Sequence, residues 1–180
     1  LMQVQRDLGI AFMVVTHDQQ EAMAMAQRIA LMQAGRIVQC ADARRIYEEP
    51  ANLFAAQFIG DINLFDADVI GDARQARARG KGAFSFDLAA SDAKPGAAKL
   101  AVRPEHLSLA EHASPGAPFA RGEVEASVYL GDTTMLRLRL ADGTSLRMSF
   151  HAAMQGRAAP ARGEEIGVTF DPARARVLQS

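Results

Sequence analysis

Residues 133–150, Thr-Thr-Met-Leu-Arg-Leu-Arg-Leu-Ala-Asp-Gly-Thr-Ser-Leu-Arg-Met-Ser-Phe, decide the fold of most of this chain. Apolar side chains recur at every second position on both sides of Asp142-Gly143, and arginines stand between them. A period of two places alternate side chains on opposite faces of a strand, and an Asp-Gly pair favours a tight turn. The stretch therefore predicts a β-hairpin with one buried face and one solvated face.

Similar short segments surround this hairpin from Asp61 to the end of the chain. Gly, Pro and Asp separate them at intervals of about ten residues, which is typical of an all-β barrel or sandwich. We expect loops over residues 71–82 and 111–118. Further strands are predicted over residues 100–102, 124–130 and 166–170.

The first 60 residues follow a different pattern, which is α/β in character. Residues 10–15 form a continuous apolar run, as in a strand covered on both faces. Asp18 and Glu21 have the spacing of a capping box, in which Asp18 caps a helix and Glu21 reaches back to the Asp18 amide. Ala34-Gly35 predicts a tight turn between two short strands. Asp42 and Asn52 are each expected to open a short helix. The parallel strands of a full α/β domain are missing.

Composition excludes several classes of protein. Among 180 residues, 20 Lys and Arg face 21 Asp and Glu, so the basic excess of a nucleic-acid-coating domain is absent. Two tyrosines and no tryptophan also disfavour base stacking. The single cysteine cannot form an internal disulfide, and no metal-ligand spacing is present. No apolar run reaches the roughly 20 residues of a membrane helix, and nothing marks export. We expect a cytosolic protein.

Thr16-His17-Asp18 is the sharpest candidate for a functional site. It lies at the carboxyl end of the predicted buried strand, where open parallel sheets bind ligands, and at the start of a helix. A histidine there could donate a hydrogen bond to a phosphate. A single histidine in such a turn more often serves only backbone groups, so His17 by itself leaves both readings open.

A longer pattern surrounds Thr16-His17-Asp18 and comprises residues 8–19, 21–23, 28–29, 32, 35–37, 46–50 and 58–60. In these residues the chain resembles the switch-histidine region and the end of the nucleotide-binding domain of ATP-binding-cassette (ABC) importer ATPases, in the polyamine, maltose and iron importer group. Asp61-Ile-Asn63 followed by Phe65 is closest to the polyamine branch, the spermidine/putrescine ATP-binding proteins. Through residues 102–105, 129–131 and 142–143, the later part is similar to the appended oligonucleotide-fold (OB, here TOBE) regulatory domain of these subunits.

This resemblance implies a fold class and two domains. Residues 1–60 would be an α/β remnant from the end of a P-loop ATPase domain, and residues 61–180 an all-β, OB-like barrel. His17 matches the switch histidine, which in the family contacts the γ-phosphate of ATP and helps to hold the attacking water and the catalytic carboxylate. His17 is thus both the catalytic and the cofactor-binding residue expected here. The cofactors of the intact family member are ATP and Mg, and no metal ligand is expected on this chain.

The resemblance also implies partners and a location. The intact subunit would pair with a second ATPase subunit, bind the transmembrane permease subunits and serve a periplasmic solute-binding protein indirectly, without nucleic acid. It would lie in the cytoplasm, peripheral on the cytoplasmic face of the bacterial inner membrane. The barrel would contribute to dimerisation and regulation.

Several parts of an ATPase are absent from the sequence. A phosphate loop needs Gly-x4-Gly-Lys-Ser/Thr, whereas Gly80-Lys81 is followed by Gly82. The cassette signature and the acidic strand are also missing. We therefore expect the C-terminal part of an importer ATPase, inactive alone. Its residues 10–15 lack partner strands, so we expect this portion to be loosely packed, domain-swapped or covered by another chain. The alternative is a free-standing OB-type module that binds a small solute or oxyanion without ATPase activity.

Overall fold

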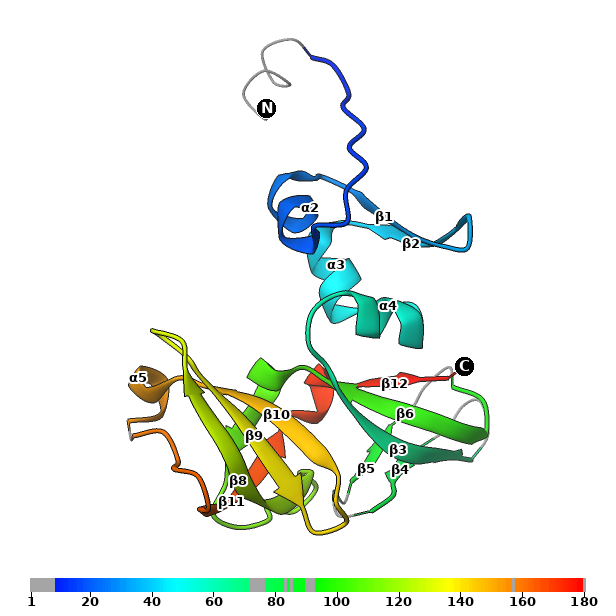
Figure 1. The fold of residues 1–180 in the computed structure, drawn as a ribbon. Helices are drawn as coiled ribbons and strands as arrows, with labels where there is room; N and C mark the ends of the chain where they lie inside the picture. Colours follow the sequence, from blue (N-terminus) through cyan, green and yellow to red (C-terminus); the bar gives the residue numbers. More distant parts are fainter. Residues whose placement is uncertain are drawn as a thin grey trace. The chain divides into compact units, whose positions relative to one another are not determined.

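The chain divides into two compact units, residues 1–60 and residues 61–180 (Figure 1). The structure is a computed structural model that describes residues 9–71, 77–82, 84, 86–89, 93–156 and 158–179.

The described residues of unit 1, 9–60, form three short helices and one hairpin. Its elements are α2 (Gln19–Met25), β1 (Ile29–Gln33), β2 (Arg36–Ala41), α3 (Ala43–Glu48) and α4 (Leu53–Phe58). Ala34 and Gly35 both have positive φ, 47° and 76°, as a two-residue hairpin turn requires. Asp42 Oδ1 accepts from the Arg45 N–H, and Asn52 Oδ1 from the Ala55 N–H. The predicted hairpin and both predicted helix caps are confirmed.

The strand predicted over residues 10–15 is wrong for this chain. These residues have no regular secondary structure, and the side chains of Met13 and Val15 are each 94% exposed. A strand exists only through hydrogen bonds to a neighbouring strand, and no described strand pairs with this segment. Apolar composition alone therefore did not make a strand here.

In unit 2 the residues that the structure describes form two five-stranded antiparallel sheets, in the orders β12-β6-β3-β4-β5 and β10-β9-β8-β11-β7. Their apolar faces form one core, in which the rings of Phe65, Phe84 and Phe170 pack against one another. The strands are β3 (Asn63–Ile70), β4 (Arg77–Gly80), β5 (Asp87–Ala89), β6 (Gly96–Val102), β7 (Leu107–Leu109), β8 (Phe119–Tyr129), β9 (Thr134–Leu140), β10 (Ser145–Phe150), β11 (Glu165–Phe170) and β12 (Arg176–Leu178).

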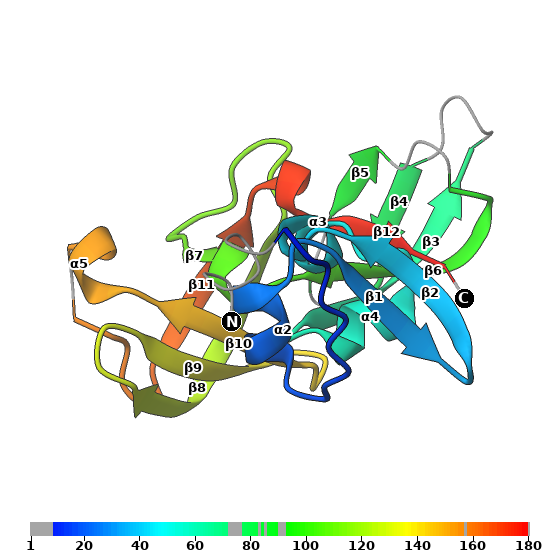
Figure 2. The same cartoon turned by 90° about the horizontal axis from the view of Figure 1, so that it is seen from above.

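Short helical segments connect some of these strands. They are the 3-10 turns η1 (Pro104–His106) and η2 (Pro172–Arg174) and the helix α5 (Ala152–Gln155). Figure 2 shows that the β8–β9 hairpin ends close to α5. A hydrogen bond of 3.2 Å between Thr133 Oγ1 and His151 Nδ1 joins the hairpin end to the residue that precedes α5.

The hairpin predicted from residues 133–150 is confirmed. β9 pairs with β10, and Asp142-Gly143 lies in the turn between them. On both strands the buried residues alternate with exposed ones, and the arginines lie on the exposed face. The period of two in the sequence therefore determined both the register and the buried face.

The loop predicted over residues 71–82 is partly wrong, because β4 occupies Arg77–Gly80. Ala78 is fully buried between two exposed arginines, and Arg77 pairs with Asp87 at 2.7 Å. A single alanine is a weak signal of a buried face. Pairing with β3 and β5 stabilises this strand.

Candidate functional site

His17 lies in a tight bend that leads into α2, and its side chain is exposed. The Asp18 N–H donates to Thr16 Oγ1 across the bend, at 3.0 Å. This bond takes the place that the capping-box pattern assigned to Glu21, so that half of the prediction is wrong. The short hydroxyl two residues back reaches the amide through a local turn, which needs no reach across the first helical turn.

The other half of the capping prediction is confirmed. Asp18 Oδ1 accepts from the N–H groups of Gln20 and Glu21, at 2.9 and 3.0 Å. These bonds satisfy two amides of the first helical turn and put a carboxylate at its positive end. An anion at this turn would therefore find these two amides already bound to Asp18, with the exposed His17 ring beside them. One ring nitrogen of a neutral imidazole can donate to such an anion.

Gln19, the first residue of α2, ties this turn to the end of unit 1. Its Nε2 donates to the Phe58 carbonyl at 2.5 Å, and its Oε1 accepts from the Gly60 N–H at 3.0 Å. Phe58 is the last residue of α4, and Gly60 has a left-handed φ of 68° just beyond it. Such positions carry backbone groups that the helix cannot satisfy, and glycine adopts this φ without strain.

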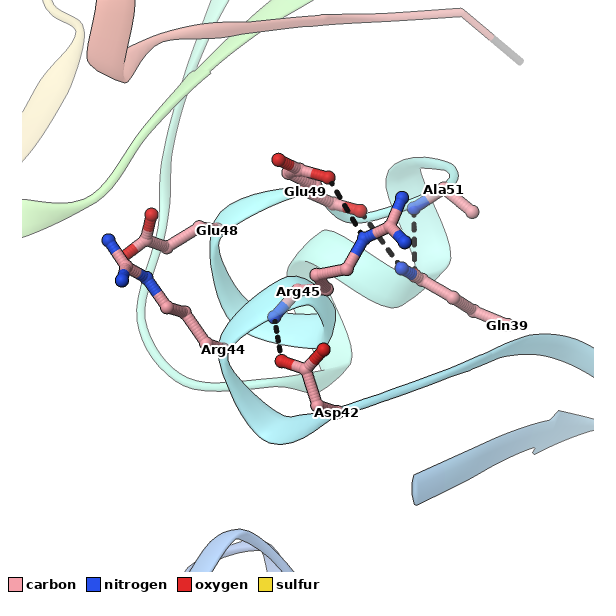
Figure 3. Close-up of polar contacts among 7 residues, drawn as sticks. All are labelled: Gln39, Asp42, Arg44, Arg45, Glu48, Glu49 and Ala51. Atoms are coloured by element: carbon pink, nitrogen blue, oxygen red, sulfur yellow. Dashed lines mark hydrogen bonds and ion pairs between the residues drawn. The ribbon is translucent and has the colours of Figure 1, made fainter. Parts of the chain in front are cut away.

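A second amide of unit 1 binds the backbone in the same manner (Figure 3). Gln39 on β2 donates to the Glu49 carbonyl at 2.9 Å and accepts from the Ala51 N–H at 2.8 Å. The two bonds hold the chain between α3 and α4. Gln19 and Gln39 thus play the same part in unit 1. Each side-chain amide binds one backbone carbonyl and one backbone N–H of a more distant segment.

Three of the motif residues, Asp61, Asn63 and Arg103, are held by hydrogen bonds or ion pairs around the start of unit 2. Asp61 is its first residue, and its carboxylate lies 2.6 Å from Arg147 Nη1 on β10. Arg103, only 3% exposed, donates from Nη1 to the Asp61 carbonyl at 3.0 Å. Asn63 binds the Arg147 backbone through both its side-chain atoms. Sequence reasoning noted Asp61, Asn63 and Arg103 as motif residues. Gln19 lies within the matched residues 8–19 and Arg147 within the predicted hairpin, but neither was assigned a contact or a role.

A groove of about 820 Å³ opens on unit 2 between β7 and the ends of β10 and β11. Four glutamates, Glu105, Glu111, Glu164 and Glu165, line it together with one arginine, Arg121. Arg121 is engaged, because its Nη2 donates to the Glu111 carbonyl at 3.1 Å and its Nη1 lies 3.7 Å from Glu165. Carboxylates repel anions, so this groove does not favour an oxyanion.

The described part of the chain contains no group of three His, Cys, Asp or Glu side chains arranged to hold a metal ion. Within the same residues, no helix has the length and apolar character needed to span a bilayer.

Comparison with known proteins shows that residues 100–178 match the TOBE domain. The spermidine/putrescine import ATP-binding protein PotA 1 of Pseudomonas aeruginosa is 41% identical over 150 residues, covering 81% of this chain and 40% of the relative. The corresponding protein of Ruegeria pomeroyi is 37% identical over 180 residues, covering 99% of this chain and 48% of the relative. The chain thus spans about half the length or less of the curated relatives that it matches.

A solved structure shares the fold. The cytoplasmic molybdate-binding protein ModG superposes with a TM-score of 0.50 at 14% identity, covering 66% of this chain and 96% of that protein. At this identity the likeness concerns the fold alone. Together with the TOBE match it confirms the predicted fold class, a small α/β piece followed by an OB-like β domain.

Proposed function

We propose, from the premise that this chain corresponds to the C-terminal part of an ABC importer ATPase subunit with its TOBE domain, that it serves the import of polyamines. The premise rests on the TOBE match and on relatives near 40% identity along most of the chain. The polyamine assignment is supported by the names of these relatives, which are spermidine/putrescine import proteins.

We assign the two units to two parts of such a subunit. Unit 1 is the end of the nucleotide-binding domain, and unit 2 is the regulatory barrel. The intact subunit would bind ATP and Mg, pair with a second ATPase subunit and engage permease subunits at the cytoplasmic face of the inner membrane. The ATP supplies the energy for import, and Mg neutralises its phosphate charge.

His17 is the residue of this chain that we place at the γ-phosphate. Its exposed ring stands in a turn that Thr16 and Asp18 hold by hydrogen bonds, so the ring is presented on a defined backbone. An imidazole N–H there would donate to the terminal phosphate and orient the attacking water, which is the positioning and charge stabilisation that phosphoryl transfer requires. The observation that carries this role is the position of His17 directly before a capped helix.

In the alternative function, an OB-type module without ATPase activity, the groove of unit 2 would be the solute-binding site. Its acidic lining supports a cationic more than an anionic solute. A module of this kind would bind its solute without any contribution from His17, and the experiment below separates the two functions on that basis.

The test uses the complete subunit assembled with its permease in proteoliposomes. His17→Ala is expected to lower ATP turnover and labelled spermidine uptake by about a hundredfold, the usual effect of losing one transition-state donor. Gln20→Ala, at an exposed position of α2 that is not among the residues lining the groove, is the control and should leave both rates unchanged. Undiminished hydrolysis by His17→Ala would contradict the proposed role. Micromolar binding of ATP and Mg by the 180-residue chain alone would contradict its expected inactivity.

A further inference from the structure

Gln19 stands where the turn that carries His17 meets the end of unit 1. It is two residues after His17 and directly after the cap residue Asp18. Residues 16–21 form one hydrogen-bonded piece, because Thr16 closes the bend and Asp18 holds the first amides of α2. A displacement of the Gln19 backbone would therefore move the backbone of His17 with it.

The Gln19 side chain reaches 39 and 41 residues along the chain to Phe58 and Gly60. It satisfies one carbonyl in the last turn of α4 and one amide just after it, which are groups that a helix end leaves without internal partners. Both atoms of one planar amide are used, so the direction of the side chain is determined as well as its distance.

The segment that Gln19 holds leads directly into unit 2. Gly60 is the last residue of unit 1, and the next residue, Asp61, is held within unit 2 by Arg103 and Arg147. The polypeptide is thus bound by side chains immediately before and immediately after the boundary between the units.

We propose that Gln19 is a positioning residue for His17, which it holds to the chain segment that joins the nucleotide-binding part to the barrel. This inference rests on the proposed function of His17, because it gives that residue a second support besides its own turn. The joining segment, residues 58–61, includes the Phe58 carbonyl and the Gly60 amide that Gln19 binds. A displacement of this segment would therefore move Gln19 and, with it, the backbone of His17. The position of the His17 imidazole therefore depends on the position of the joining segment.

The first test measures amide hydrogen exchange in the 180-residue chain. In Gln19→Ala, exchange at Gly60 should accelerate about tenfold, as expected for the loss of an intramolecular hydrogen-bonded pair, and the amides of residues 17–21 should accelerate with it. Gln20→Ala, at the exposed next position of the same helix, is the matched control. It should change neither the exchange at Gly60 nor the exchange at residues 17–21. A Gly60 amide that is unprotected in the unaltered chain, or one that accelerates without residues 17–21, overturns the inference.

The second test uses ATP turnover by the complete subunit. Gln19→Ala should lower kcat about five- to tenfold with KM for ATP unchanged, because the imidazole is misplaced and not removed. Gln19→Glu keeps the acceptor for Gly60 but loses the donor for Phe58, so it should recover part of the rate. A kcat equal to that of Gln20→Ala overturns the inference. Should His17→Ala itself leave turnover intact, the proposed function fails, whereas the exchange result still reports whether Gln19 positions residues 17–21.

Discussion

The side-chain amide of Asn63 forms two hydrogen bonds with the backbone of Arg147, which lies 84 residues further along the chain. Nδ2 donates to the Arg147 carbonyl at 2.7 Å, and Oδ1 accepts from the Arg147 N–H at 2.8 Å. Asn63 is 5% exposed at the start of β3, and Arg147 lies in β10, the outermost strand of the other sheet. The amide thus covers part of a strand edge and joins the two sheets of unit 2.

The first prediction concerns this pair. Asn63→Leu should lower the free energy of unfolding of unit 2 by about 1–3 kcal/mol, because it leaves the part-buried N–H and carbonyl of Arg147 without their side-chain partner. Urea unfolding of the 180-residue chain measures the change. Ser145→Ala, at an exposed position of the same strand β10, is the control and should change stability by less than about 0.5 kcal/mol. A loss no greater than that of Ser145→Ala would contradict the prediction.

The second prediction concerns a close approach at Gly167 in β11. A Cβ there would lie 2.2 Å from the Ala110 carbonyl oxygen and 2.8 Å from a ring carbon of Phe119. The carbonyl belongs to the backbone that pairs with β11, so it cannot move aside cheaply. Gly167→Ala should therefore destabilise unit 2 by about 1–3 kcal/mol, the usual cost of overpacking.

Thermal unfolding provides the measurement for Gly167→Ala. Ala173→Ser, at an exposed position of η2, serves as the control. An unchanged midpoint for Gly167→Ala would mean that β7 and β11 are further apart than the structure places them.

The third prediction concerns pH. Lys99 Nζ lies 2.6 Å from Asp66 Oδ1, and this hydrogen bond and the Lys99 charge lower the pKa of Asp66. Because the folded-state pKa is below the unfolded value of about 3.9, the pair stabilises the fold above that value and loses its effect as pH falls through the folded pKa. Both side chains are largely exposed, so the effect is small and screened by salt.

Carboxyl NMR titration of Asp66 checks this prediction. Lys99→Met should move its pKa upward, and the stability difference from the unaltered chain should vanish at the acid end. Lys94→Met, at an exposed lysine of the same unit, should leave the Asp66 titration in place. An Asp66 titration that is the same in Lys99→Met and in the unaltered chain would refute the assignment.

The fourth prediction concerns the apolar segment Ile10–Val15. In the 180-residue chain, Met13→Asp should change the free energy of unfolding by less than about 0.5 kcal/mol, because the side chain is 94% exposed. In the complete subunit the same variant should be strongly destabilising if another strand covers the segment, since each buried apolar side chain contributes about 1.5–3 kcal/mol.

Paired unfolding curves of the short chain and the complete subunit make the comparison for Met13→Asp. Gln33→Asp, at an exposed position of β1, adds the same single negative charge and is the control. Full exchange protection of the Ile10–Val15 amides in a monomeric short chain would contradict the exposed arrangement.

The local features of this chain could be predicted because their partners lie within a few residues. The caps at Asp18, Asp42 and Asn52 bind amides two or three positions ahead. The β9–β10 hairpin followed from alternation and one Asp-Gly turn. His17 was selected as a candidate by its place between a predicted strand and a capped helix. The strand proved wrong, and the role of His17 stays a prediction.

Other features required the folded chain. β4 has only Ala78 as its buried signal, so its pairing with β3 and β5 made it a strand. The segment Ile10–Val15 shows the converse. Its residues favour a β-strand, but no described strand lies beside it to form hydrogen bonds, so it is not a strand. The predicted hydrogen bond between the Glu21 side chain and the Asp18 N–H does not form, because the Asp18 N–H donates to the nearer Thr16 Oγ1.

The sequence by itself determined where helices begin, where hairpins turn and which faces of β9 and β10 are apolar, because these depend on short-range backbone geometry and on period. Only the tertiary structure decided that Gln19 holds Phe58 and Gly60, that Asn63 holds Arg147 and that Arg103 holds Asp61. Each of these contacts spans 39 or more residues. The identity of an amide or guanidinium side chain does not indicate which distant backbone group it will bind, because that depends on how the chain folds.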